Sequence, residues 1–114
     1  MFQALATHLR LLQPRQAWYN TTNLVSVRRL SEDGERFGLD VRIAEGRSET
    51  RYEVTLTKKD HARLARPGET AEAFVERCFA FLLAREPKES ILTRFDVSVI
   101  ARYFPEFERV IREV

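Results

Sequence analysis

The feature that most constrains the fold is a strict alternation of apolar and polar residues in the middle of the chain. Its apolar positions are Phe37, Leu39, Val41 and Ile43, with Arg36, Gly38, Asp40 and Arg42 between them. Because successive side chains of a strand point to opposite faces, this pattern predicts a strand with one buried face and one wet face. A second run with the same period contains Tyr52, Val54 and Leu56, and Glu45-Gly46-Arg47-Ser48 before it is a plausible hairpin turn.

An earlier strand is predicted over residues 24–30, joined to the next one through an Asp33-Gly34 turn. Its apolar residues do not share one face: Val25 and Val27 lie on one face of the predicted strand, whereas Leu24 and Leu30 lie on the other. We therefore expect a three-stranded antiparallel meander over residues 24–57 whose irregular first strand leaves an open edge. Gly38, in a strand interior, would mark a bulge or a close approach.

After Thr57 the apolar period becomes helical. Thr57 and Asp60 fit a capping box, and Pro67-Gly68 ends that first short helix. A second helix is predicted from about Thr70 to Glu86, before Pro87. Its apolar positions span an arc of roughly 200°, too wide for one flat sheet to cover, so this helix must be contacted on two sides. These positions are Ala71, Phe74, Val75, Cys78, Phe79, Phe81, Leu82 and Leu83.

The C-terminal segment is rich in aromatic residues and in helix signals. Asp96 is a good N-cap, Phe95 and Ile100 form a hydrophobic staple, and Pro105 suits the first turn of the last helix. The apolar stripe of that helix is narrow, which indicates one neighbour, the uncovered side of the central helix. We therefore interpret the aromatic tail as the lid of a small core and not as a recognition surface.

Together these patterns predict a single α+β domain over residues 1–114. Residues 1–23 would form an N-terminal helix and linker, residues 24–57 the β-meander, and residues 58–114 the helical part, packed on one face of the sheet. The length of 114 residues and the hydrophobic content of 44% agree with one soluble core. A single cysteine excludes an internal disulfide, and no apolar run approaches the roughly 20 residues of a membrane span. We expect a cytoplasmic protein that does not contact membranes.

The segment FLLAREPKESILTRFDVSVIARYFPEF, residues 81–107, carries a distinctive order of motifs. A buried helix ends in REP, and ESIL, FD and YFPEF follow it. This order resembles the C-terminal signature of a family of small uncharacterised bacterial proteins. The resemblance implies a bacterial, cytoplasmic, stand-alone domain, and it carries no functional residue to this chain because the family has no assigned activity.

The residues give little support to an enzyme. Cys78 lies in an apolar helix face, where burial makes a thiol inert, and neither His8 nor His61 has a second ligand at metal spacing. The four glycines are isolated, so no phosphate-binding loop is predicted. We assign no catalytic residue, no metal and no cofactor. Among the possible functions, we rank an enzyme third, after two kinds of binding module.

Nucleic-acid binding is the second of these alternatives. It would use a basic segment after Thr57, comprising Lys58, Lys59, Arg63 and Arg66. It would also use arginines on the wet face of the sheet, namely Arg28, Arg36, Arg42 and Arg51, with Arg47 as a further candidate. Neighbouring acids such as Asp40 and Glu53 would neutralise much of this charge, and no aromatic residue is predicted on the wet face to stack a base.

Protein association is the preferred alternative. Trp18 and Tyr19 have no place in the predicted core, and both residue types are enriched at interface hot spots. The N-terminal amphipathic helix either covers the first strand of its own chain or contributes to a homodimer, and both alternatives stay open. We predict a non-enzymatic protein-interaction or regulatory domain, with a weak nucleic-acid-binding module as the alternative.

Overall fold

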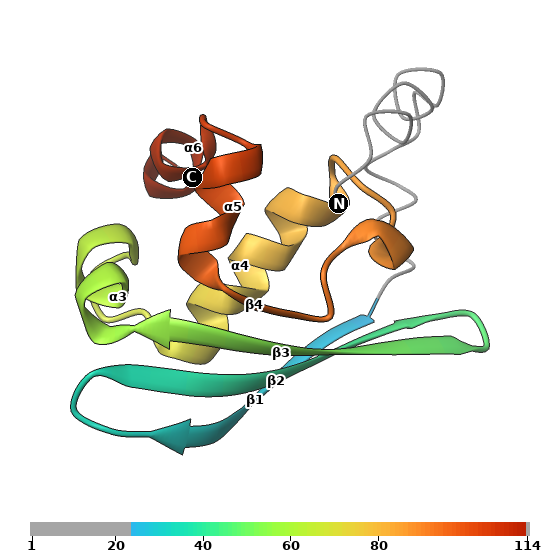
Figure 1. Ribbon diagram of the computed structural model, residues 1–114, viewed down its shortest axis with the longest axis horizontal. Coiled ribbons are helices and arrows are strands. Elements are labelled where there is room, and N and C mark those ends of the chain that lie inside the picture. Colours follow the sequence, from blue (N-terminus) through green and yellow to red (C-terminus); the bar gives the residue numbers. More distant parts are fainter. Residues whose placement is uncertain (1–23, 114) are drawn as a thin grey trace.

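The computed structural model of the chain describes residues 24–113, which form an α+β fold (Figure 1). Its strands are β1 (Leu24–Glu32), β2 (Arg36–Glu45), β3 (Ser48–Thr57) and β4 (Arg94–Asp96). Its helices are α3 (Lys58–Leu64), α4 (Ala71–Leu83), α5 (Ile100–Tyr103) and α6 (Phe107–Glu113), with short 3-10 helices η1 (Lys88–Ser90) and η2 (Val97–Val99). None of the helices in residues 24–113 is long and apolar enough to cross a membrane.

The sheet has the order β1-β2-β3-β4, so the predicted three-stranded meander lacks one strand. The pairs β1–β2 and β2–β3 are antiparallel as expected, whereas β4 pairs with β3 in parallel. The Glu53 amide donates to the Thr93 carbonyl at 2.8 Å, where β4 joins the sheet. Three residues are too short to show a period of two, and Phe95 therefore reads in the sequence as the residue before a helix.

Asp96 has two roles at the end of this short strand. One carboxylate oxygen accepts the Ser98 amide at 3.0 Å and caps η2, which leads directly into α5. The other accepts the Thr55 hydroxyl at 2.5 Å and ties the end of β4 to β3. The predicted N-cap is confirmed, and it also fixes the position of β4.

The irregular first strand contains a β-bulge. The register of β1 against β2 is continuous from Leu24 to Arg29 and then shifts, so that Ser31 lies opposite Gly38. A Cβ on Gly38 would overlap the Ser31 hydroxyl. A larger residue at position 38 would therefore require the Ser31 hydroxyl to move, and the bulge changes the parity of β1 after Arg29.

Side-chain caps begin the first two helices of the described chain. The sequence predicts the cap at Thr57, and for the second helix it predicts only the start near Thr70. The Thr57 hydroxyl accepts the Asp60 amide at 3.0 Å, and the Thr70 hydroxyl accepts the Ala73 amide at 3.0 Å. The helix α4 ends at Leu83, three residues before the predicted end at Glu86. The Glu86 amide still donates to the Leu82 carbonyl at 2.8 Å, so the residues after Leu83 form a tight final turn.

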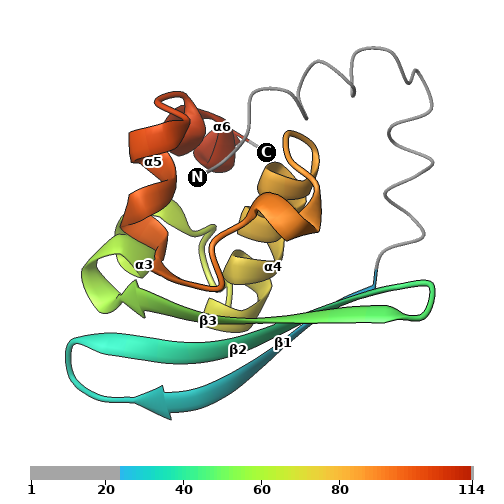
Figure 2. The ribbon, with the colours of Figure 1, turned by 45° about the vertical axis from the view of Figure 1, so that its right-hand side comes forward.

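The four helices of residues 24–113 lie on one face of the sheet, and no other element of these residues covers the opposite face (Figures 1 and 2). The predicted two-sided contact of α4 is present. On the sheet side, the Phe79 ring centroid lies 5.2 Å from that of Tyr52. On the far side, Phe81 packs edge-on against Phe104 and Phe107, at 5.8 and 5.1 Å. The aromatic tail thus closes the core on the far side of α4.

Candidate binding site

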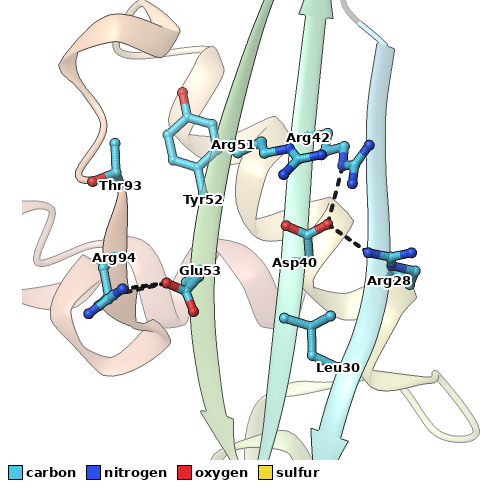
Figure 3. A pocket seen from close by; sticks show the side chains of 9 residues that line it. All are labelled: Arg28, Leu30, Asp40, Arg42, Arg51, Tyr52, Glu53, Thr93 and Arg94. Atoms are coloured by element: carbon cyan, nitrogen blue, oxygen red, sulfur yellow. Dashed lines mark hydrogen bonds and ion pairs between the residues drawn. The ribbon is translucent and has the colours of Figure 1, made fainter.

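The open face of the sheet holds a shallow groove of about 670 Å³, here called the open-face groove (Figure 3). Its charged lining residues come from all four strands and are Arg28, Asp40, Arg42, Arg51, Glu53 and Arg94. The alternation of β2 and β3 sends these side chains away from the core, because the apolar residues between them face the helices. Four arginines and two acids give this groove a positive excess.

One row across the sheet is balanced in charge, with two arginines and two acids. The strand register aligns Arg28 with Asp40, Asp40 with Glu53, and Glu53 with Arg94. Arg94 lies 2.6 Å from Glu53, and Arg28 lies 3.6 Å from Asp40. The arginines stand at the two ends of the row and the acids in its middle, as predicted for a cross-strand ladder.

The next row is not balanced, because Arg42 and Arg51 are directly opposite each other on β2 and β3. Arg42 reaches the Asp40 carboxylate at 3.3 Å, which Arg28 also contacts. Arg51 makes no ion pair with residues 24–113, and its side chain lies beside that of Arg42 (Figure 3). Two guanidinium groups thus share one carboxylate, and the third, that of Arg51, adds its charge beside them. Like charges directly opposite are destabilising, so an incoming anion here would relieve repulsion as well as form contacts.

The groove continues toward the outer strand. A second hollow of about 300 Å³ shares Arg28, Asp40 and Arg42 and extends to Leu24. Leu24 is 69% exposed and Leu30 is 53% exposed, both on β1. The positive groove therefore has apolar side chains along its outer border.

The predicted basic segment lies elsewhere. The helix α3, which contains Lys58, Lys59 and Arg63, lies with the other helices on the side of the sheet opposite the open-face groove, and Arg66 follows it in the chain (Figures 1 and 2). Lys58 lies 2.7 Å from Glu32. The two clusters that the sequence suggested as one nucleic-acid surface do not share a face.

Arg63 is held by two carboxylates. It lies 3.0 Å from Asp60 and 2.8 Å from Glu108, and this ion pair lowers the pKa of Glu108. Its charge is thus already compensated within the fold, whereas that of Arg51 is not.

Other predicted residues lie outside the groove. Arg36 begins β2 and Arg47 lies in the β2–β3 turn, and neither lines the groove. Trp18, Tyr19 and His8 lie outside the described residues.

The described residues offer little for catalysis. Cys78 is buried, and burial raises the pKa of its thiol. The His61 Nε2 atom lies 2.8 Å from the Glu69 carbonyl oxygen, and its ring packs against Phe37 and Phe74. Within residues 24–113, no group of three or more His, Cys, Asp or Glu side chains could hold a metal ion.

Comparison of the chain with protein-family models, with curated proteins and with solved structures finds no match. The resemblance of residues 81–107 to an uncharacterised bacterial family stays a prediction.

The pairing of Arg42 with Arg51 was missed in the sequence, although a signal for it exists. The loop between Glu45 and Ser48 has two residues, and Gly46 has a positive φ of 60°. A two-residue hairpin loop fixes the register of both strands, and counting back from it places Arg42 opposite Arg51.

Proposed function

We propose that this chain is a non-enzymatic interaction module that binds an acidic segment of a partner protein in the open-face groove. One observation carries the proposal: Arg42 and Arg51 are directly opposite each other, and Arg42 shares the carboxylate of Asp40 with Arg28. Carboxylates of a partner would complete this cluster through charge-assisted hydrogen bonds, and arginine forks are suited to such contacts.

Several features favour a protein partner over a nucleic acid. Asp40 and Glu53 stand in the middle of the groove, where they would repel a continuous phosphate backbone. The aromatic residues of the described strands, Phe37, Tyr52 and Phe95, are buried. Tyr52 borders the groove, but at 1% exposed it leaves no ring surface on which a base could stack. Leu24 and Leu30 would contact apolar side chains of a peptide.

The test is an amide NMR titration of the full chain with a poly-glutamate peptide. We expect shifts concentrated at β2 and β3, and a Kd at least tenfold weaker in the variant Arg42→Gln with Arg51→Gln, equal to about 1.4 kcal/mol. This variant should fold, because it removes a repulsive pair from an exposed face. The matched control is Arg109→Gln with Arg112→Gln, two exposed arginines of α6, which should leave the Kd unchanged. Equal weakening by both variants would contradict a specific site.

The same titration with a single-stranded oligonucleotide tests the alternative. Binding that is tighter than that of poly-glutamate, and that collapses when Lys58, Lys59 and Arg63 are replaced by Glu, would favour the nucleic-acid-binding module. Light scattering behind a sizing column, with absorbance at 260 and 280 nm, checks for co-purified nucleic acid. It also tests the homodimer, which Trp18→Ala and Tyr19→Ala should weaken if those residues form the interface.

A further inference from the structure

The strand β1 forms one edge of the sheet and pairs, among the described strands, with β2 alone. An edge strand presents a row of backbone N–H and C=O groups that can pair with another chain. The opposite edge is different, because β4 has only three residues and turns immediately into η2. A long template for strand addition is therefore present at β1 and not at β4.

The bulge limits the length of this template. Six residues, Leu24 to Arg29, keep a continuous register with β2 before it shifts. Beyond the bulge the backbone twists and regular pairing is interrupted. An added segment would accordingly pair over about six residues.

The two faces of these six residues differ in which side chains a partner could contact. On the helix side, Val25 and Val27 are half-buried, and Arg29 is held by Glu72 at 2.7 and 3.0 Å. On the open side, Leu24 is exposed and the side chain of Arg28 is 68% exposed. Arg28 is 3.6 Å from an Asp40 carboxylate that Arg42 contacts at 3.3 Å. Arg28 is therefore the positive group of this edge that a partner can reach.

From this juxtaposition we propose that β1 accepts an added strand from an acidic partner protein. The added segment has an acidic residue beside Arg28 and, four positions away on the same face, an apolar residue beside Leu24. The spacing follows from the period of two along a strand, and it holds for parallel and antiparallel addition. The inference rests on the proposed function for the choice of an acid, while strand addition itself rests on the edge of β1.

The test titrates the full chain by NMR with two capped six-residue peptides, Leu-Thr-Thr-Thr-Glu-Thr for parallel addition and Thr-Glu-Thr-Thr-Thr-Leu for antiparallel addition. The tighter binder of the two is the parent peptide, and three relatives are made of it. One relative replaces Glu by Gln, and two carry N-methyl groups on alternate amides, each blocking one edge of the peptide. We expect shifts at the β1 amides, at least fivefold weaker binding of the Gln peptide, and at least tenfold weaker binding of one N-methyl peptide but not of the other.

The outcomes separate the two proposals. Equal binding of the parent and both N-methyl peptides would overturn strand addition while leaving the acidic preference intact. Loss with one N-methyl peptide but no effect of Gln would support strand addition and contradict the role of the carboxylate. No binding of the parent peptide, or a stable dimer that occupies β1, would overturn the inference.

The variant Arg28→Gln should weaken binding of the parent peptide at least fivefold. Its matched control is Arg109→Gln, an exposed arginine of α6 that lies outside the groove, and this control should leave the Kd within twofold. Equal weakening by the two variants would overturn the assignment to β1.

Discussion

Tyr52 shows what a single side chain contributes beyond its place in an alternating pattern. The sequence places it correctly on the buried face of β3, where it is 1% exposed. Its hydroxyl donates to the Lys88 carbonyl at 2.5 Å, and the Lys88 ammonium group donates to Thr50 at 2.7 Å. Periodicity could not predict this partner, because it lies in an irregular segment after α4. The hydrogen bond of Tyr52 thus holds the segment around Lys88 against the sheet.

The variant Tyr52→Phe tests this bond. It keeps the ring but leaves the Lys88 carbonyl without its donor, so we expect the free energy of unfolding to fall by about 1–2 kcal/mol. Urea denaturation followed by circular dichroism measures the change. The control Tyr103→Phe, at a site that is 42% exposed, should change it by less than about 0.5 kcal/mol. Equal effects of the two variants would argue against the buried bond.

At the scale of elements, the helix starts were predictable and the connections between elements were not. Thr57 and Thr70 cap the helices at which the sequence places them, because a cap is a local signal of four residues. The short strand β4 has no such signal, since its pairing with β3 depends on residues some 41 positions away. Arg77 is a similar case. It contacts Glu69 at 2.7 Å and the Ile111 carbonyl at 2.7 Å, and so joins α4 to both of its neighbours.

Replacing Arg77 by Met should remove the contacts that join α4 to Glu69 and to α6. The change leaves the Glu69 carboxylate, which is 8% exposed as a side chain, without its ionic partner and with the hydrogen bond from the Arg66 amide. We expect a loss of about 2–4 kcal/mol in the free energy of unfolding, by urea denaturation. Arg109→Met removes an exposed pair with Glu113 and should cost less than about 0.5 kcal/mol. A loss for Arg77→Met as small as that for Arg109→Met would show that the contact is not stabilising.

At the scale of the whole molecule, the charges were predictable in number but not in arrangement. The sequence shows interspersed signs and a net charge of +2, which indicates a solvated, ion-paired surface. The fold pairs most of this charge on the helical side and leaves a positive excess on the open face. That difference depends on strand register, because the register brings arginines that are far apart in the sequence, such as Arg42 and Arg51, side by side.

The ion pairs also predict how stability depends on pH. Ionic and hydrogen-bonded partners lower the pKa of Glu32, Asp33, Glu69, Glu72, Glu89 and Glu108. The folded chain then binds fewer protons than the unfolded chain, so the free energy of unfolding should fall as pH drops below the ordinary glutamate value of about 4.5. Urea denaturation between pH 6 and pH 3 measures the slope. Glu69→Gln should make it shallower, whereas Glu76→Gln, an exposed change on α4, should not. An unchanged slope for Glu69→Gln would contradict the role of its ion pair.

The parallel pairing of β4 also sets an order of events during synthesis. The strands β1, β2 and β3 are joined by short turns and can pair as soon as they leave the ribosome. The outer edge of β3 has no partner until the segment around Phe95 has been made, some forty residues later. Until then the nascent sheet is open on both edges, and only the last third of the chain closes one of them.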